Sequence, residues 1–192
     1  ETTPGSYGYV YALAIDGDDV YVGGSFSMAG GRAVTNIARW DAAAGTWNAL
    51  GSGVSGSGRV NDIALGHGYV YAAGDFTAAG TVSLDDVARW DGTAWSALGK
   101  GISFGYSSLS AVEVAGQYVF VGGDFSYVRP PGATEDVDVD GLIAWDSQAD
   151  EWYSFDVGLR LAGSFGDYAG SVSDLQLIGT DLYVAGEFDK AG

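Results

Sequence analysis

Cysteine is absent from the 192-residue sequence, and histidine occurs only once. Without cysteine the chain can form neither a disulfide framework nor a thiolate metal site. Basic residues are scarce too: 8 Lys and Arg stand against 25 Asp and Glu, for a formal net charge of −17. Such a charge repels nucleic-acid phosphates and anionic membrane surfaces. No run of eighteen apolar residues is present, so the sequence predicts neither a nucleic-acid partner nor membrane insertion.

Proline is rare, whereas glycine is abundant. The chain has 3 Pro and 32 Gly, with 47% hydrophobic and 14% aromatic residues. This composition is typical of short strands joined by tight turns and predicts an all-β protein. High acidity and few lysines, with much Gly, Ser, Thr and Tyr, favour a bacterial extracellular protein, either secreted or at the cell surface. The start without methionine fits a processed mature protein and an excised piece equally well.

A tandem repeat organises the chain. Each repeat contains a β run, a doublet of small residues and then an aromatic residue. The four copies are Val20–Phe26, Val70–Phe76, Val119–Phe125 and Leu182–Phe188. Their aromatic residues are 50, 49 and 63 positions apart, so the third unit carries insertions. Units of this length bury their apolar faces by stacking on neighbouring units.

Each complete unit resolves into four predicted strands, which in the first unit are 10–15, 20–24, 36–40 and 46–50. Short turns rich in residues that tolerate positive φ join the first and second strands, which indicates antiparallel hairpins. Four-stranded antiparallel sheets repeated at this length are the blades of a β-propeller. The sequence therefore predicts one propeller segment of about three and a half blades, at residues 8–54, 58–102, 107–157 and 170–192.

The motif order resembles kelch repeats and the propeller of galactose-oxidase-like proteins, in the form found in bacterial secreted proteins. The residues that carry the resemblance are Gly23-Gly24 at the end of the second strand, Ala38-Arg39-Trp40-Asp41 in the third, and Trp47 in the fourth. The resemblance implies that the doublet admits a close neighbour and that paired tryptophans fill the gap between blades. The residues given this core role are Trp40, Trp47, Trp90, Trp95, Trp145 and Trp152. It does not imply copper chemistry, because that site needs histidine ligands and a cysteine.

Three and a half blades do not close a ring, because propellers have about 4 to 8 blades. The sequence therefore indicates either a part of a longer protein or one of several copies that complete a ring together. Strand parity places the connections between second and third strands, and those between blades, on one rim. We call this edge the long-loop rim, and loops held by a rigid scaffold are where function is usually found.

Aromatic and arginine side chains gather on the long-loop rim of the third unit. The candidate ligand-binding residues are Phe104, Tyr106, Tyr127, Arg129, Arg160 and Tyr168. Aromatic faces combined with planar donors suit recognition of a glycan or the centre of a protein contact. The alternative is that these rings pack over the ends of the blades as a satellite cluster.

Calcium is the one cofactor that the sequence suggests. Asp136, Asp138 and Asp140 alternate before Gly141, which matches the opening of an EF-hand-type loop whose carboxylates surround a hard cation. The twelfth place of that loop is Ser147 rather than glutamate, so the match is partial. Alternating Asp and Val equally describe a solvated edge strand.

No catalytic residue is assigned. His67 is the only histidine, and its position in a predicted hairpin turn does not place it beside a serine for a Ser-His-Asp triad. The leading hypothesis is a non-catalytic extracellular interaction or scaffold module that binds a protein or glycan through the long-loop rim. The alternatives are a structural subunit that completes a propeller ring by oligomerisation, and a fragment of a larger secreted hydrolase whose catalytic residues lie elsewhere.

Overall fold

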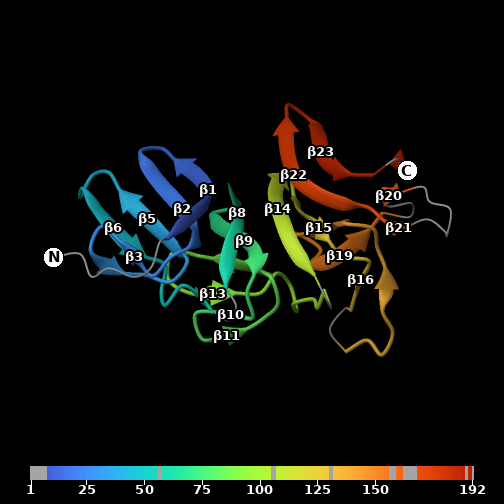
Figure 1. The fold of residues 1–192 in the computed structure, drawn as a ribbon, viewed down its shortest axis with the longest axis horizontal. Helices are drawn as coiled ribbons and strands as arrows, with labels where there is room; N and C mark the ends of the chain where they lie inside the picture. The colour runs from blue at the N-terminus through green and yellow to red at the C-terminus, as the bar shows by residue number, and fades with distance from the viewer. Residues whose placement is uncertain are drawn as a thin grey trace.

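The computed structural model describes residues 8–55, 58–104, 107–129, 132–155, 159–161, 168–188 and 190–191. Within these ranges the chain forms strands and turns and no helix, which confirms the predicted all-β class (Figure 1). A helix long and apolar enough to cross a membrane is accordingly not found in the described ranges.

Three four-stranded antiparallel sheets follow one another along the chain. The first consists of β1 (Tyr9–Asp16), β2 (Asp19–Ser25), β5 (Ile37–Asp41) and β6 (Thr46–Ala49). The second consists of β8 (Arg59–Gly66), β9 (Tyr69–Asp75), β12 (Val87–Trp90) and β13 (Trp95–Ser96). The third consists of β14 (Ser108–Ala115), β15 (Tyr118–Asp124), β18 (Leu142–Asp146) and β19 (Glu151–Ser154). In the first sheet, each strand boundary predicted from sequence lies within one residue of the observed boundary.

A fourth sheet contains only two strands, β22 (Ser171–Ile178) and β23 (Asp181–Glu187), where half a blade was predicted. Short strands pair within the connections between the longer strands. They are β3 (Met28–Ala29) with β4 (Arg32–Ala33); β7 (Val54–Ser55) with β10 (Ala78–Ala79) and β11 (Val82–Ser83); β16 (Tyr127–Val128) with β17 (Val137–Asp138); and β20 (Leu159–Leu161) with β21 (Tyr168–Ala169) and β24 (Lys190–Ala191).

The four sheets stand in a row, joined through their first strands. β1 lies beside β8, β8 beside β14, and β14 beside β22 (Figure 1). The row is open, with the sheet of β1 at one end and the sheet of β22 and β23 at the other (Figure 1). The core fills the spaces between successive sheets, because each sheet alone is too thin to shelter its apolar side chains.

The second residue of each small-residue doublet is glycine for a steric reason. Every first strand contains a β-bulge opposite the doublet, such as the register shift between Val60 and Asp62. At the second position, a Cβ on Gly74 would collide with the Arg59 carbonyl oxygen of the bulge. The same collision within the sheet occurs at Gly24, Gly123 and Gly186. Glycine is therefore required there in all four sheets.

The hairpin turns use backbone conformations that favour glycine. His67 has φ of 54°, close to the values of 60° to 65° for the glycines at the same turn position in the other sheets. Its imidazole contacts the Tyr71 hydroxyl at 3.1 Å and the Gly116 carbonyl oxygen at 2.7 Å. The prediction that His67 is an exposed turn residue is confirmed.

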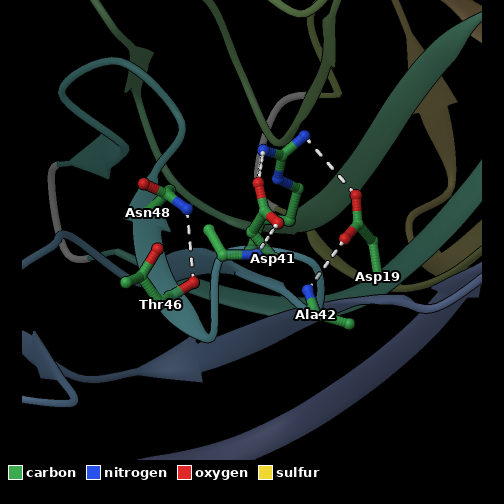
Figure 2. A network of polar contacts seen from close by, with 7 residues as sticks. Asp19, Asp41, Ala42, Thr46 and Asn48 are labelled. Atoms are coloured by element: carbon green, nitrogen blue, oxygen red, sulfur yellow. Dashed lines mark hydrogen bonds and ion pairs between the residues drawn. The ribbon is translucent and has the colours of Figure 1, made fainter.

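The aspartate that follows the third-strand tryptophan caps the turn into the fourth strand. Asp41 Oδ1 accepts a hydrogen bond from the Ala44 amide at 2.9 Å, and Arg39 pairs with Asp41 and with Asp19 (Figure 2). Asp91 and Asp146 hold the corresponding turns, and hydrogen bonds from backbone amides lower the pKa of both carboxyls. Trp-Asp is thus a turn motif, which gives this part of the repeat a structural explanation.

Candidate functional site

The long-loop rim exists as a physical edge. Connections between sheets pair there with connections between second and third strands, as when Val54 of β7 faces Ala79 of β10. Between the next two sheets, Ser103 and Arg129 exchange backbone hydrogen bonds of 3.1 and 2.7 Å. These pairings confirm that both kinds of connection share one edge, as strand parity predicts.

A cavity of about 330 Å³ lies on this rim between the second and third sheets. Its walls combine the connection into β12, the connection that follows β13, and the segment after β16. The lining side chains that carry charge or an N–H donor are Asp85, Lys100, Arg129 and Trp152. The volume is within the range of small-molecule sites, about 300 to 1,000 Å³.

Two cations, Lys100 and Arg129, line the cavity of this acidic chain beside Asp85. Lys100 is exposed, and the Arg129 guanidinium lies 2.7 Å from the Asp136 carboxylate in a partly exposed ion pair. Trp152 contributes an indole whose Nε1 is buried and finds no hydrogen-bond acceptor among the described residues. A buried donor without an acceptor is energetically costly.

The structure separates the six predicted ligand-binding residues. Arg129 lines the cavity, and Tyr127 is half-buried in β16. Phe104 is wrong as an exposed binding residue: it is 1% exposed, and its ring packs edge-on against Phe125 and Trp152 at centroid distances of 5.2 and 6.2 Å. Burial in the core releases its whole apolar surface from water, which explains why an aromatic residue in a loop turns inward.

The side chains of the other three candidates lie outside the part of the chain that the structure describes. Tyr106 lies outside the described residues. Arg160 and Tyr168 belong to the paired strands β20 and β21, whose side chains also lie outside the described part. Their role in binding stays a prediction.

The acidic segment proposed for calcium forms a hairpin arm. Val137 and Asp138 in β17 pair with β16, and Asp136 pairs with Arg129. Gly141 then enters β18 with φ of 70°. Among the described residues no group of three or more His, Asp or Glu side chains lies close enough to hold a metal ion. Calcium binding by Asp136, Asp138 and Asp140 stays a prediction.

Gly141 has a structural role that the calcium interpretation did not anticipate. Its amide donates to the Phe125 carbonyl oxygen at 3.0 Å, as Asn36 does to Phe26 and Asp86 does to Phe76. Asn36 and Asp86 also have positive φ, 63° and 61°. Gly141 therefore occupies the position that precedes the third strand, where all three complete sheets have a left-handed backbone.

Asp86 is the titratable group most affected by its surroundings at this rim. Desolvation by burial raises its pKa from 3.8 to about 6, although hydrogen bonds from the Ser107 hydroxyl and the Phe76 amide lower it. The first sheet has Asn36 at this position, where the amide donates to the Val54 carbonyl oxygen at 3.1 Å. Asp86 is therefore an acid in a place that suits a neutral side chain.

Ser103 lies on the cavity within the pattern Gly101-x-Ser103-x-Gly105. A catalytic serine in this pattern sits on a sharp turn from a strand into a helix. Here the Ser103 backbone forms an isolated β-bridge with Arg129, and the described residues around it include no helix. The Ser103 backbone is therefore held in a pairing with Arg129, and the described residues around it do not form the strand-to-helix turn of that motif.

Sequence reasoning missed Asp85 and Lys100 and assigned Trp152 only to the core. Lys100 is one of 8 basic residues in a strongly acidic chain, which is a signal that composition could have supplied. Trp95 and Trp145 are buried as predicted, whereas the other four repeat tryptophans are half-buried. Which tryptophan borders a cavity depends on the neighbouring connection and cannot be read from the repeat.

No family model matches the sequence, and no curated protein matches it significantly. The crystal structure of the computationally designed Ika4 protein superposes with a TM-score of 0.57 at 15% identity, covering 96% of this chain and 89% of that chain. The computationally designed Ika8 protein gives a TM-score of 0.36 at 14% identity, covering 93% and 68%. The likeness to Ika4 concerns the fold alone, and the kelch-like resemblance stays a prediction from the repeat motifs.

Proposed function

We propose that the protein is a non-catalytic extracellular interaction module, built from kelch-like propeller blades, that binds a glycan in the cavity on its long-loop rim. The observation that carries the proposal is the joint presence of Lys100, Arg129 and the Trp152 indole around one concave site. Cations suit the carboxylate oxygens of an acidic sugar, and an aromatic side chain suits the wall of a sugar site. A cavity of this size favours a sugar over a protein surface, because protein contacts cover a much wider area.

The chemistry of the lining favours binding over catalysis. Asp85 is the one carboxylate among the described lining residues, whereas glycoside hydrolysis uses two flanking carboxylates. His67 is engaged in its turn by Tyr71 and Gly116. The site therefore offers donors and a single carboxylate for recognition, without a pair of carboxylates for turnover.

A glycan array with the purified chain tests the proposal, followed by calorimetric titration of the retained glycans. We expect acidic glycans to be retained, and Arg129→Ala and Lys100→Ala each to weaken binding about tenfold through the loss of a charge-assisted hydrogen bond.

Arg59→Ala is the matched control, because Arg59 is also an exposed ion-paired arginine, 2.6 Å from Asp75, and lies outside the cavity lining. It should leave glycan binding unchanged. A protein that retains no glycan, or cavity variants that bind as well as the wild type, would refute the proposed site. Retention of a protein but no sugar would point to the protein-binding form of the hypothesis.

A further inference from the structure

The sheets at the two ends of the row each leave one apolar face uncovered. On the first sheet this face carries Val10, Leu13 and Ile15 of β1, which are 56%, 67% and 70% exposed. On the fourth sheet it carries Ile178 and Tyr183, 59% and 56% exposed, together with the exposed Ala185. Apolar patches of this kind mark interaction sites.

These two faces correspond to the two faces that meet inside the molecule. Val60 and Ile63 of β8 pack over Gly23 of β2, where an added Cβ would lie 2.5 Å from Val60 Cγ1. Val172 and Leu175 of β22 pack over Gly122 of β15 in the same way. Both contacts thus place the first strand of one sheet over the first doublet position of the preceding sheet.

Strand register identifies the counterparts at the open ends. Val10 and Leu13 occupy the places of Val60 and Ile63. Ala185 occupies the place of Gly23 and Gly122, and the second sheet has the buried Ala73 there, so alanine is compatible with a packed neighbour. Leu13 is 67% exposed, whereas its internal counterparts Ile63, Val112 and Leu175 are 6%, 2% and 4% exposed.

A second apolar contact and a hydrogen bond repeat with the same spacing. Val114 packs on Gly66, and the counterparts of these two residues are Ile15 and Ile178. Asp62 accepts the amide of Ile63 with Oδ1 and the amide of Val112 in the next sheet with Oδ2, both at 2.8 Å.

Asp174 is the counterpart of Asp62 in the fourth sheet. It accepts the Leu175 amide at 3.0 Å and is exposed. In the register of the internal contacts, the amide that would reach its second carboxylate oxygen belongs to the counterpart of Val112, which is Leu13 of β1.

We propose that a second copy of this chain docks head to tail on these faces, with β1 of one copy packed on β22 and β23 of the other. Leu13 and Val10 then cover Ala185, Ile15 meets Ile178, and Asp174 accepts the Leu13 amide. One molecule carries both the β1 face and the complementary face of β22 and β23. A second copy of the chain can therefore supply the partner for either face. Such a heterologous contact uses two different surfaces and closes into a ring when the rotation between copies permits.

Sedimentation equilibrium over a range of concentrations tests the self-association. We expect the wild type to exceed its monomer mass of 19.8 kDa at high concentration. Leu13→Glu and Ala185→Lys should each be monomeric and keep the wild-type circular dichroism spectrum, because both side chains are exposed in the single chain. Asp174→Ala should weaken the association about tenfold through one lost hydrogen bond to a charged acceptor.

Mixing the two monomeric variants distinguishes the head-to-tail contact from a symmetric one. The β1 face is unchanged in the Ala185→Lys copy, and the β23 face is unchanged in the Leu13→Glu copy. These two unchanged faces can bind each other, so the mixture should form a species of twice the monomer mass. Val137→Glu is the control: Val137 is an exposed apolar side chain of β17, away from both end faces, and its variant should associate like the wild type.

Three outcomes overturn the proposal. They are a wild-type protein that is monomeric at all concentrations, an unaltered association of Leu13→Glu, and a mixture of the two variants that stays monomeric.

Discussion

β8 and β1 occupy equivalent positions in neighbouring sheets, yet their apolar side chains have opposite environments. Val60 and Ile63 of β8 are buried against the doublet of the first sheet, whereas Val10 and Leu13 of β1 face outward. The sequence of the two strands gives little hint of this difference, because both alternate Val, Leu, Ile and Ala. The contrast teaches that burial in a repeat array is decided by the presence of a neighbouring sheet.

The largest expected effect tests this contrast directly. Ile63→Ala should lower the free energy of unfolding by about 2 to 5 kcal/mol, because it removes buried methylene groups and leaves a cavity. Leu13→Ala should change it by less than about 0.5 kcal/mol in the monomer, because Leu13 is exposed. Urea unfolding at micromolar protein concentration measures both, and equal losses would break the comparison.

A second pair of variants identifies a position where end and interior sheets should behave alike. Gly24→Ala and Gly74→Ala each place a Cβ against the carbonyl oxygen of the bulge within their own sheet. Both should therefore cost about 1 to 3 kcal/mol, the usual penalty of overpacking. A much smaller cost in the end sheet than in the interior, measured by thermal unfolding, would contradict the proposed origin of the doublet.

A third comparison concerns two tryptophans at equivalent places. Trp95 Nε1 donates to the Leu50 carbonyl oxygen at 2.8 Å, and this hydrogen bond joins the first and second sheets. Trp95→Phe should lower the free energy of unfolding by about 1 kcal/mol, since this buried hydrogen bond is lost while the Leu50 carbonyl oxygen keeps its bond from the Gly53 amide. Trp152→Phe should cost less, because its Nε1 has no acceptor among the described residues. Denaturant midpoints of the two variants decide the order.

The smallest expected effect is a pH dependence at Asp86. The raised pKa means that the folded state binds the proton more tightly than the unfolded chain between pH 3.8 and about 6, so stability falls as the pH rises through this window. Asp86→Asn removes the titration and should raise stability by about 1 kcal/mol above pH 6, with the gain vanishing towards pH 4. Asn36→Asp should show the reverse, and melting temperatures measured from pH 4 to 8 test both.

Much of the fold could be predicted because the repeated motifs mark the turns and the ends of the strands. The doublet, the Trp-Asp turn and the hairpin positions at Gly17 and His67 each impose a local backbone conformation, so their spacing marks strand boundaries to within a residue. The six binding candidates were less predictable. Phe104 and Arg129 looked alike as loop residues, but one is buried and the other lines a cavity.

By itself, then, the sequence determined the all-β class, the four repeated units and the strands within them, because hydrogen-bonded hairpins and left-handed glycine positions are local. Only the tertiary structure decided which residues pair between the connections at the long-loop rim, that Lys100 joins Arg129 around one cavity, and that β1 and β23 present open faces. The physical reason is that contacts between sheets join residues about fifty positions apart, and their geometry depends on how the sheets stack.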